Sequence, residues 1–221
     1  KHMAIKEIEL NIPQSWNDVS LKKFLKLQSE LKNYEEDEAK FAVMLTILCG
    51  LDEKYLGGIA LTDYFGLQRD LASFMNNVES PLSKYITIDG VEYGFEPNLS
   101  EMSYGAYVDI TQYKEIAIND NWAKIMNILY RPVIDKKVGF YAIQPYTGDT
   151  NYEKWLDVPM DKHFGALFFL LNLSMDLAKS TLKYSKVTDL TQNWQQILGK
   201  SGEVISQFTN WHKETSTDLI P

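Results

Sequence analysis

Residues 161–184 constrain the fold of this chain more than any other stretch. Their apolar side chains recur at steps of three and four residues, which is typical of a helix burying one broad face. This stripe comprises Phe164, Leu167, Phe168, Leu171, Met175, Ala178 and Leu182. Phe169, Leu170 and Leu173 make the first half apolar on nearly every side, so we expect other elements to surround it. Asp161 stands where an N-cap belongs, because its carboxylate can accept from first-turn amides. The sequence therefore predicts a central core helix.

Two helices are predicted near the start of the chain. Asp18 or Ser20 can cap the first, whose buried stripe comprises Leu21, Phe24, Leu25 and Leu31. The acidic run at residues 35–38 opens the second, since carboxylates in a first turn oppose the positive end of the helix dipole. This second helix, residues 39–49, is apolar nearly all round, and Gly50 is a natural C-terminal stop.

Further helices are predicted along the rest of the chain. Asp52 and Thr62 mark two starts, and Ser100 caps a helix that runs to about Lys114. Asn119 or Asp120 caps another, which Pro132 ends and whose stripe comprises Trp122, Ile125, Met126, Leu129 and Tyr130. A last helix is indicated by Leu190, Trp194, Ile197, Leu198, Val204, Ile205, Phe208 and Trp211.

Short strands lie between these helices. Residues 8–12 alternate apolar and polar, which predicts a half-buried strand that Pro13 ends. Asp89-Gly90 between two β-rich runs predicts a hairpin with a type I′ turn. Residues 140–143 predict a strand that can pair with residues 133–134. We therefore expect an α+β fold, predominantly helical with a small antiparallel sheet or hairpins, as one domain over residues 4–221, with residues 1–3 a cloning remnant.

The charge and composition of the chain restrict the kinds of partner that it is expected to bind. The formal net charge is −8, which disfavours nucleic acid, because phosphate binding needs concentrated Lys and Arg. The clusters Lys22-Lys23 and Lys136-Lys137 are small and typical of solvated surfaces. The longest apolar run, residues 166–171, is too short to cross a bilayer, so no membrane partner is expected. Cys49 is the only cysteine, which excludes an intrachain disulfide.

No arrangement of residues predicts catalysis, a cofactor or a metal. Cys49 falls at a predicted helix C-terminus, where the dipole raises a thiol pKa, so we expect a buried structural thiol. His163 and His212 lack the close ligand partner that a zinc site needs, so each is expected to be structural or on the surface. No P-loop, GxGxxG or GxSxG motif is present. Arg131 precedes Pro132 at a helix end, and we expect it to be buried, paired with a carboxylate and holding a loop.

Aromatic side chains of the last predicted helix are the candidate partner-binding residues. These are Trp194, Phe208 and Trp211, of the types that dominate interface energetics. The alternative is that this helix simply closes the core, as apolar stripes commonly do. Most of the other tryptophans are expected in the core.

Three segments together resemble a known family. They are residues 12–21 (IPQSWNDVSL), residues 128–133 (ILYRPV) with 141–146 (YAIQPY), and residues 159–161 before 165–169 (GALFF). The combination resembles virion and tail-assembly proteins of tailed phages of Bacteroides-type hosts, some of them described as tail assembly chaperones. The resemblance implies phage structural proteins or further copies of the chain as partners, and a place in the host cytoplasm during assembly or in the virion. It implies no catalytic residues.

Two functions are therefore weighed. The first is a non-enzymatic phage protein that acts by protein–protein contact, as an assembly chaperone or minor structural component, which predicts exposed apolar surface. The second is a small hydrolase-like phage enzyme with an unrecognised carboxylate site, which predicts a deep pocket holding carboxylates or histidines with shifted pKa values.

Overall fold

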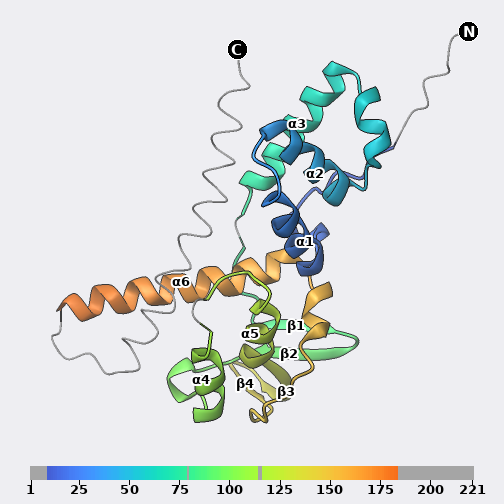
Figure 1. Ribbon diagram of the computed structural model, residues 1–221. Coiled ribbons are helices and arrows are strands. Elements are labelled where there is room, and N and C mark those ends of the chain that lie inside the picture. The colour runs from blue at the N-terminus through green and yellow to red at the C-terminus, as the bar shows by residue number, and fades with distance from the viewer. Residues whose placement is uncertain (1–8, 79, 114–115, 184–221) are drawn as a thin grey trace, which may run out of the picture.

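The computed structural model describes residues 9–78, 80–113 and 116–183, and it has an α+β fold (Figure 1). The helices are α1 (Leu21–Leu31), α2 (Asp37–Cys49), α3 (Leu61–Asn76), α4 (Tyr104–Thr111), α5 (Trp122–Leu129) and α6 (Met160–Lys183). The strands are β1 (Tyr85–Ile88), β2 (Val91–Phe95), β3 (Tyr130–Lys137) and β4 (Phe140–Ile143). Short 3-10 turns are η1 (Trp16–Asp18), η2 (Glu53–Gly58), η3 (Leu99–Glu101) and η4 (Glu153–Asp157).

The predicted central helix is confirmed as α6. It runs between a group formed by α1, α2 and α3 and a group formed by the sheet, α4 and α5 (Figure 1). Phe164 meets the rings of Trp16 and Phe24 on the first side, at 5.0 and 5.6 Å between centroids. Phe169 meets Phe95 of β2 on the other side, at 5.3 Å. These edge-on contacts join both groups through one helix.

Details of α6 differ from the prediction. The helix begins at Met160, so Asp161 lies in its first turn and not at the N-cap. A carboxylate there still faces the positive helix end. Phe164 and Leu167 are buried, but Phe168 is partly exposed and Phe169 is 37% exposed, so the surrounding shell is incomplete. Side chains after Leu173 in the stripe lie outside the description.

The starts of α1 and α6 are tied together by backbone bonds. Leu21 N donates to Val158 O at 3.1 Å, and Met160 N donates to Val19 O at 2.8 Å. Ser20 caps α1 as predicted, because its Oγ accepts from Lys23 N at 3.3 Å. The pairing fixes how the first helix enters the core.

Several other predicted helix boundaries need correction. Ser103, not Ser100, caps α4, and this helix ends at Thr111, well before Lys114. Asn121 occupies the N-cap position of α5, one residue past the predicted Asp120, and the chain enters β3 at Tyr130 before reaching Pro132. The helix predicted from Thr62 starts at Leu61, and the one predicted from Asp52 is the 3-10 turn η2. Gly50 ends α2 with φ +72°, as expected.

The four strands form one antiparallel sheet in the order β1-β2-β3-β4. Asp89 and Gly90 have φ of 51° and 79°, and Ile88 pairs with Val91, so the type I′ hairpin is confirmed. The pairing of residues 133 and 143 is also confirmed, within a longer β3. The strand predicted at 8–12 is wrong over residues 9–12, which form no regular element although Leu10 and Ile12 pack against the core.

Candidate functional site

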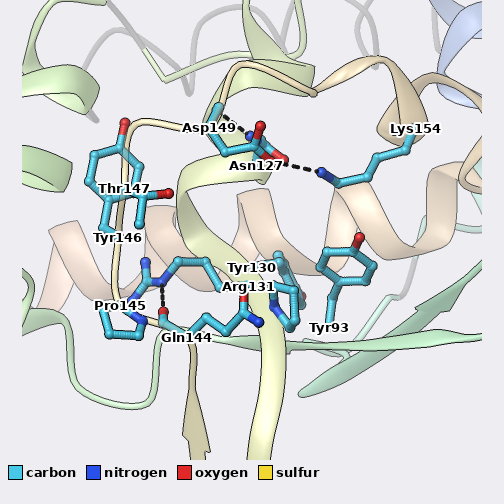
Figure 2. A pocket seen from close by; sticks show the side chains of 11 residues that line it. Tyr93, Asn127, Tyr130, Arg131, Gln144, Pro145, Tyr146, Thr147, Asp149 and Lys154 are labelled. Carbon is cyan, nitrogen blue, oxygen red and sulfur yellow. Dashed lines mark hydrogen bonds and ion pairs between the residues drawn. The ribbon is translucent and has the colours of Figure 1, made fainter.

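One small pocket, of about 80 Å³, opens between the sheet, α5 and the segment that follows β4 (Figure 2). Its lining comprises Tyr93, Asn127, Tyr130, Arg131, Pro132, Gln144, Pro145, Tyr146, Thr147, Asp149 and Lys154. These residues come from β2, α5, β3, η4 and the irregular segment between β4 and η4. The volume is far below the 300–1,000 Å³ typical of small-molecule sites, so the pocket fits little more than a few waters.

Arg131 forms one wall of the pocket, and each of its three guanidinium nitrogens contacts the protein. Nη2 forms an ion pair with Glu96, whose side chain is 9% exposed. Nε donates to Gln144 O at 2.7 Å, and Nη1 donates to Ile128 O at 2.8 Å. This confirms the predicted buried Arg–carboxylate pair that holds a loop. These hydrogen bonds hold the C-terminal end of α5 against the segment that follows β4.

Asn127 and Lys154 anchor the opposite wall, around Asp149 (Figure 2). Asn127 Nδ2 donates to Asp149 O at 2.7 Å, and Asn127 Oδ1 accepts from Trp155 Nε1 at 3.1 Å. The backbone N–H of Asn151 is the main cause that lowers the pKa of Asp149, and Lys154 at 3.6 Å adds to it. Asp149 is therefore ionised at neutral pH, the opposite of what a general acid needs.

Tyr146 completes the pocket by donating its hydroxyl hydrogen to Asp109 of α4. Burial is the largest cause that raises the pKa of Tyr146, and the bond to Asp109 adds to it, so the phenol stays protonated. The segment after β4 is thus held at residues 144, 146 and 149 by three different elements. Residues 144–149 therefore form a loop that is held in place, and the pocket beside it is not an open cleft of the kind that catalysis requires.

His163 is a structural residue, as one of the two sequence alternatives has it. It is fully buried, and its Nδ1 accepts from Trp122 Nε1 at 3.1 Å. Since an indole N–H can only donate, Nδ1 carries no proton and Nε2–H donates to Val158 O at 3.2 Å. Desolvation lowers the pKa of His163 to about 3, so the ring is neutral at physiological pH.

Cys49 is buried as predicted, and desolvation raises its pKa to about 11. Such a thiol is a poor nucleophile at neutral pH. Among residues 9–78, 80–113 and 116–183, no group of three or more His, Cys, Asp or Glu side chains could hold a metal ion. No helix in the described part of the chain has both the length and the apolarity needed to cross a membrane.

Three of the nine large apolar residues that are exposed among the described residues lie on the β3–β4 hairpin. Ile134 is 59% exposed, Phe140 is 56% exposed, and Val138 at the turn is fully exposed. Ile134 is the extra residue between the pairs Val133–Ile143 and Asp135–Ala142, so a bulge turns it out of the ladder. Gly139 supplies the positive φ, +78°, that the turn after Val138 requires. We call Ile134, Val138 and Phe140 the hairpin tip.

The predicted partner-binding residues Trp194, Phe208 and Trp211 lie outside the described residues, as does His212. Trp16, Trp122 and Trp155 are core residues, as expected for most of the tryptophans. Sequence reasoning missed both the hairpin tip and the pocket residues Asn127, Tyr146 and Lys154. The Val-Gly pair between residues 137 and 140 is a turn signal that could have drawn attention to the tip.

Comparisons of the chain with protein-family models, with curated proteins and with solved structures found no match.

Proposed function

We propose that this chain is a non-enzymatic phage protein that acts by protein–protein contact in virion or tail assembly, as an assembly chaperone or minor structural component. The observation that carries the proposal is the hairpin tip, where Ile134, Val138 and Phe140 present apolar side chains to solvent on one short hairpin. Grouped exposed apolar residues are costly to leave wet and commonly mark contact surfaces.

The position of the tip suits a contact role. β4 has four residues and is the last strand in the sheet order, so the hairpin lies at an edge of the described sheet. Arg131, held by Glu96 and two backbone oxygens, fixes the base of the same hairpin. Tyr141 strengthens it by donating its hydroxyl hydrogen to Phe95 O at 2.7 Å. A rigid base that presents apolar side chains loses little conformational freedom on binding, which favours affinity.

The ionisable groups of the pocket and of the core also support a contact role over catalysis. Arg131 is paired with Glu96, and Lys154 with Asp149. His163 and Cys49 are buried with pKa values that keep them neutral. These groups serve the fold, whereas the side chains of the hairpin tip are exposed to solvent.

Co-expression tests the proposal. The chain is produced with candidate virion structural proteins of tailed phages of Bacteroides-type hosts, and size-exclusion chromatography measures co-elution. We expect at least one structural protein to become more soluble and to co-elute with the wild-type chain. The double variant Val138→Asp with Phe140→Ser should lose that complex while its circular dichroism is unchanged. Absence of any complex, or a complex that the variant keeps in full, would refute the proposal.

A further inference from the structure

The outer edge of β4 carries backbone groups that no described strand pairs. β4 is the last strand in the sheet order, and its partner in the described sheet is β3. Gln144 N donates to Pro132 O at 2.8 Å, which places the backbone groups of residue 144 on the β3 side. Because these groups alternate in direction along an antiparallel strand, those of Tyr141 and Ile143 point to the outer edge. Among the described residues, no backbone hydrogen bond outside the helices and strands uses them.

The β4 edge lacks the features that usually protect a free strand. Native proteins commonly place a charged side chain or a proline on such an edge, which discourages pairing with another chain. β4 is residues 140–143 (FYAI) and holds neither. The strand at the opposite edge, β1, is flanked by Lys84 and Asp89. The β4 edge is therefore the less protected of the two.

The sequence of β4 is complementary to itself in one antiparallel register. A two-fold axis at Ala142 sets Tyr141 of one copy opposite Ile143 of the second copy, and the reverse. The outward N–H and C=O groups of both residues then bond each other across the axis. An aromatic residue opposite a β-branched one is a favourable cross-strand pair. Ala142, which faces its own copy at the axis, is small enough for the strands to approach closely.

The neighbouring registers fit less well. An axis at Ile143 would set Tyr141 opposite Pro145 of the second copy, which has no N–H to donate. An axis at Tyr141 would set Ile143 opposite Gly139, which lies in the turn with φ +78° and not in the strand. The axis at Ala142 is the register that uses all the outward groups of β4.

The charges of the sheet do not oppose this contact. The four strands hold Arg131, Lys136 and Lys137 against Glu92 and Asp135, so the net charge of −8 arises outside the strands. Lys136 pairs with Glu92 at 2.9 Å, and Lys137 pairs with Asp135 at 3.2 Å. The repulsion between two copies therefore comes from other parts of the chain, and salt screens it over about 8 Å at physiological ionic strength.

We propose that two copies of the chain pair through the outer edge of β4, antiparallel about a two-fold axis at Ala142, and join their sheets into one. The contact is isologous, so it closes at a dimer. Because the paired strand has four residues, the contact is small and the dimer dissociates on dilution. This inference goes beyond the proposed function and does not rest on it.

A cysteine at the axis tests the register directly. Residues that face each other without exchanging hydrogen bonds have Cα atoms about 4.5 Å apart, within the range of about 4.4–6.8 Å that a disulfide needs. Ala142→Cys in the full-length chain should therefore form a covalent dimer on mild oxidation, measured by non-reducing electrophoresis. Wild type should not, because Cys49 is buried. Tyr104→Cys, at a side chain that is 81% exposed, controls for random collision and should cross-link at least tenfold more slowly.

Charges at the axis test the same contact without covalent chemistry. Light scattering after size-exclusion chromatography measures the mass of the full-length chain as a function of concentration. Wild type should form a dimer that strengthens as salt rises. Ala142→Lys and Ala142→Glu each bring two like charges together, so each should dimerise at least tenfold more weakly at low salt, with unchanged circular dichroism. An equimolar mixture of the two variants should restore the dimer, which separates repulsion at the axis from a folding defect.

Several results would overturn the proposal. These are a wild-type chain that stays monomeric at every concentration, a dimer that neither charged variant weakens, or a mixture of the two variants that stays monomeric. Cross-linking of Ala142→Cys no faster than that of Tyr104→Cys would overturn it as well. A co-expressed structural protein that replaces the second copy at this edge would assign the edge to that protein instead.

The outcome is independent of the proposed function. If a structural protein co-elutes with a chain that does not dimerise, only the inference about β4 fails. If the chain dimerises at Ala142 and no structural protein co-elutes, the assembly role fails while the β4 contact stands.

Discussion

Gly165→Ala tests whether α6 is the packing centre of the fold. Gly165 lies in the buried first half of α6, where the chain at Pro81 crosses the helix closely. A Cβ added there would lie 2.4 Å from Pro81 O and 3.0 Å from the Pro81 carbonyl carbon. Ordinary contacts of a Cβ begin at 3.4 Å, so the backbone at Pro81 or the helix must move by about 1 Å.

Two opposing effects set the magnitude. Alanine is favoured over glycine in a helix interior by about 1 kcal/mol. Overpacking a rigid core costs roughly 1–3 kcal/mol, and the upper part of that range applies here because the obstacle is backbone. We therefore expect Gly165→Ala to lower the free energy of unfolding by roughly 1–2 kcal/mol.

Gly66→Ala in α3 is the matched control, because a Cβ at Gly66 meets nothing within 4 Å. This change should raise the free energy of unfolding by about 0.5–1 kcal/mol through helix propensity alone. Urea denaturation followed by circular dichroism measures both variants against wild type. Stabilisation of Gly165→Ala to the same degree as Gly66→Ala would refute the close packing of α6 against residues 81–82.

Three further predictions concern the hairpin turn and the buried titratable groups. Gly90→Val should lower the urea midpoint, since a β-branched residue is strained at φ +79°, and an unchanged midpoint would argue against the type I′ turn. Burial holds the pKa of His163 at about 3, below its ordinary 6.5, so the unfolded chain binds the extra proton between these values. Stability should then fall as pH drops from 6.5 towards 3, by up to about 1.4 kcal/mol per pH unit, and His163→Gln should remove that component. Because the pKa of Cys49 is raised to about 11, a thiol reagent at pH 7.5 should label Cys49 only in denaturant, and fast labelling of the native chain would show an accessible thiolate.

Features with a strong local signal could be predicted from the sequence. The Asp89-Gly90 turn has positive φ at both positions, and few residue pairs other than Asn-Gly or Asp-Gly tolerate this. Gly50 ends α2 in the left-handed conformation for the same reason. The apolar spacing of residues 164–171 predicted α6, because the residues that a helix buries on one face recur every three or four positions.

Boundaries were predicted less well, because several residues compete for one role. Ser100 and Ser103 can both cap, and the sequence does not rank them, although only Ser103 Oγ accepts from a first-turn amide of α4. At residues 9–12 the alternation is real, since Leu10 and Ile12 pack against the core. Among the described residues, however, no strand pairs with them, and alternation without a partner does not make a sheet.

The candidate site could be predicted only in part, because its contacts join distant residues. The buried pairing of Arg131 was expected from its place before Pro132, but the choice of Glu96, 35 residues away, depends on the β2–β3 pairing. Asn127 reaches Asp149 across 22 residues, and no spacing rule links them. The exposure of Ile134 could not be predicted, because it depends on a bulge in the β3–β4 register that the sequence of one strand does not reveal.

The central claim is that the hairpin tip makes the functional contact, and the affinity of the co-eluting structural protein tests it most directly. Dissociation constants are measured for wild type, for Val138→Asp with Phe140→Ser, and for Tyr104→Ser, a control at a side chain that is 81% exposed elsewhere on the surface. The account predicts at least tenfold weaker binding for the hairpin variant and a change below twofold for the control. Equal affinity of the hairpin variant and wild type would contradict it.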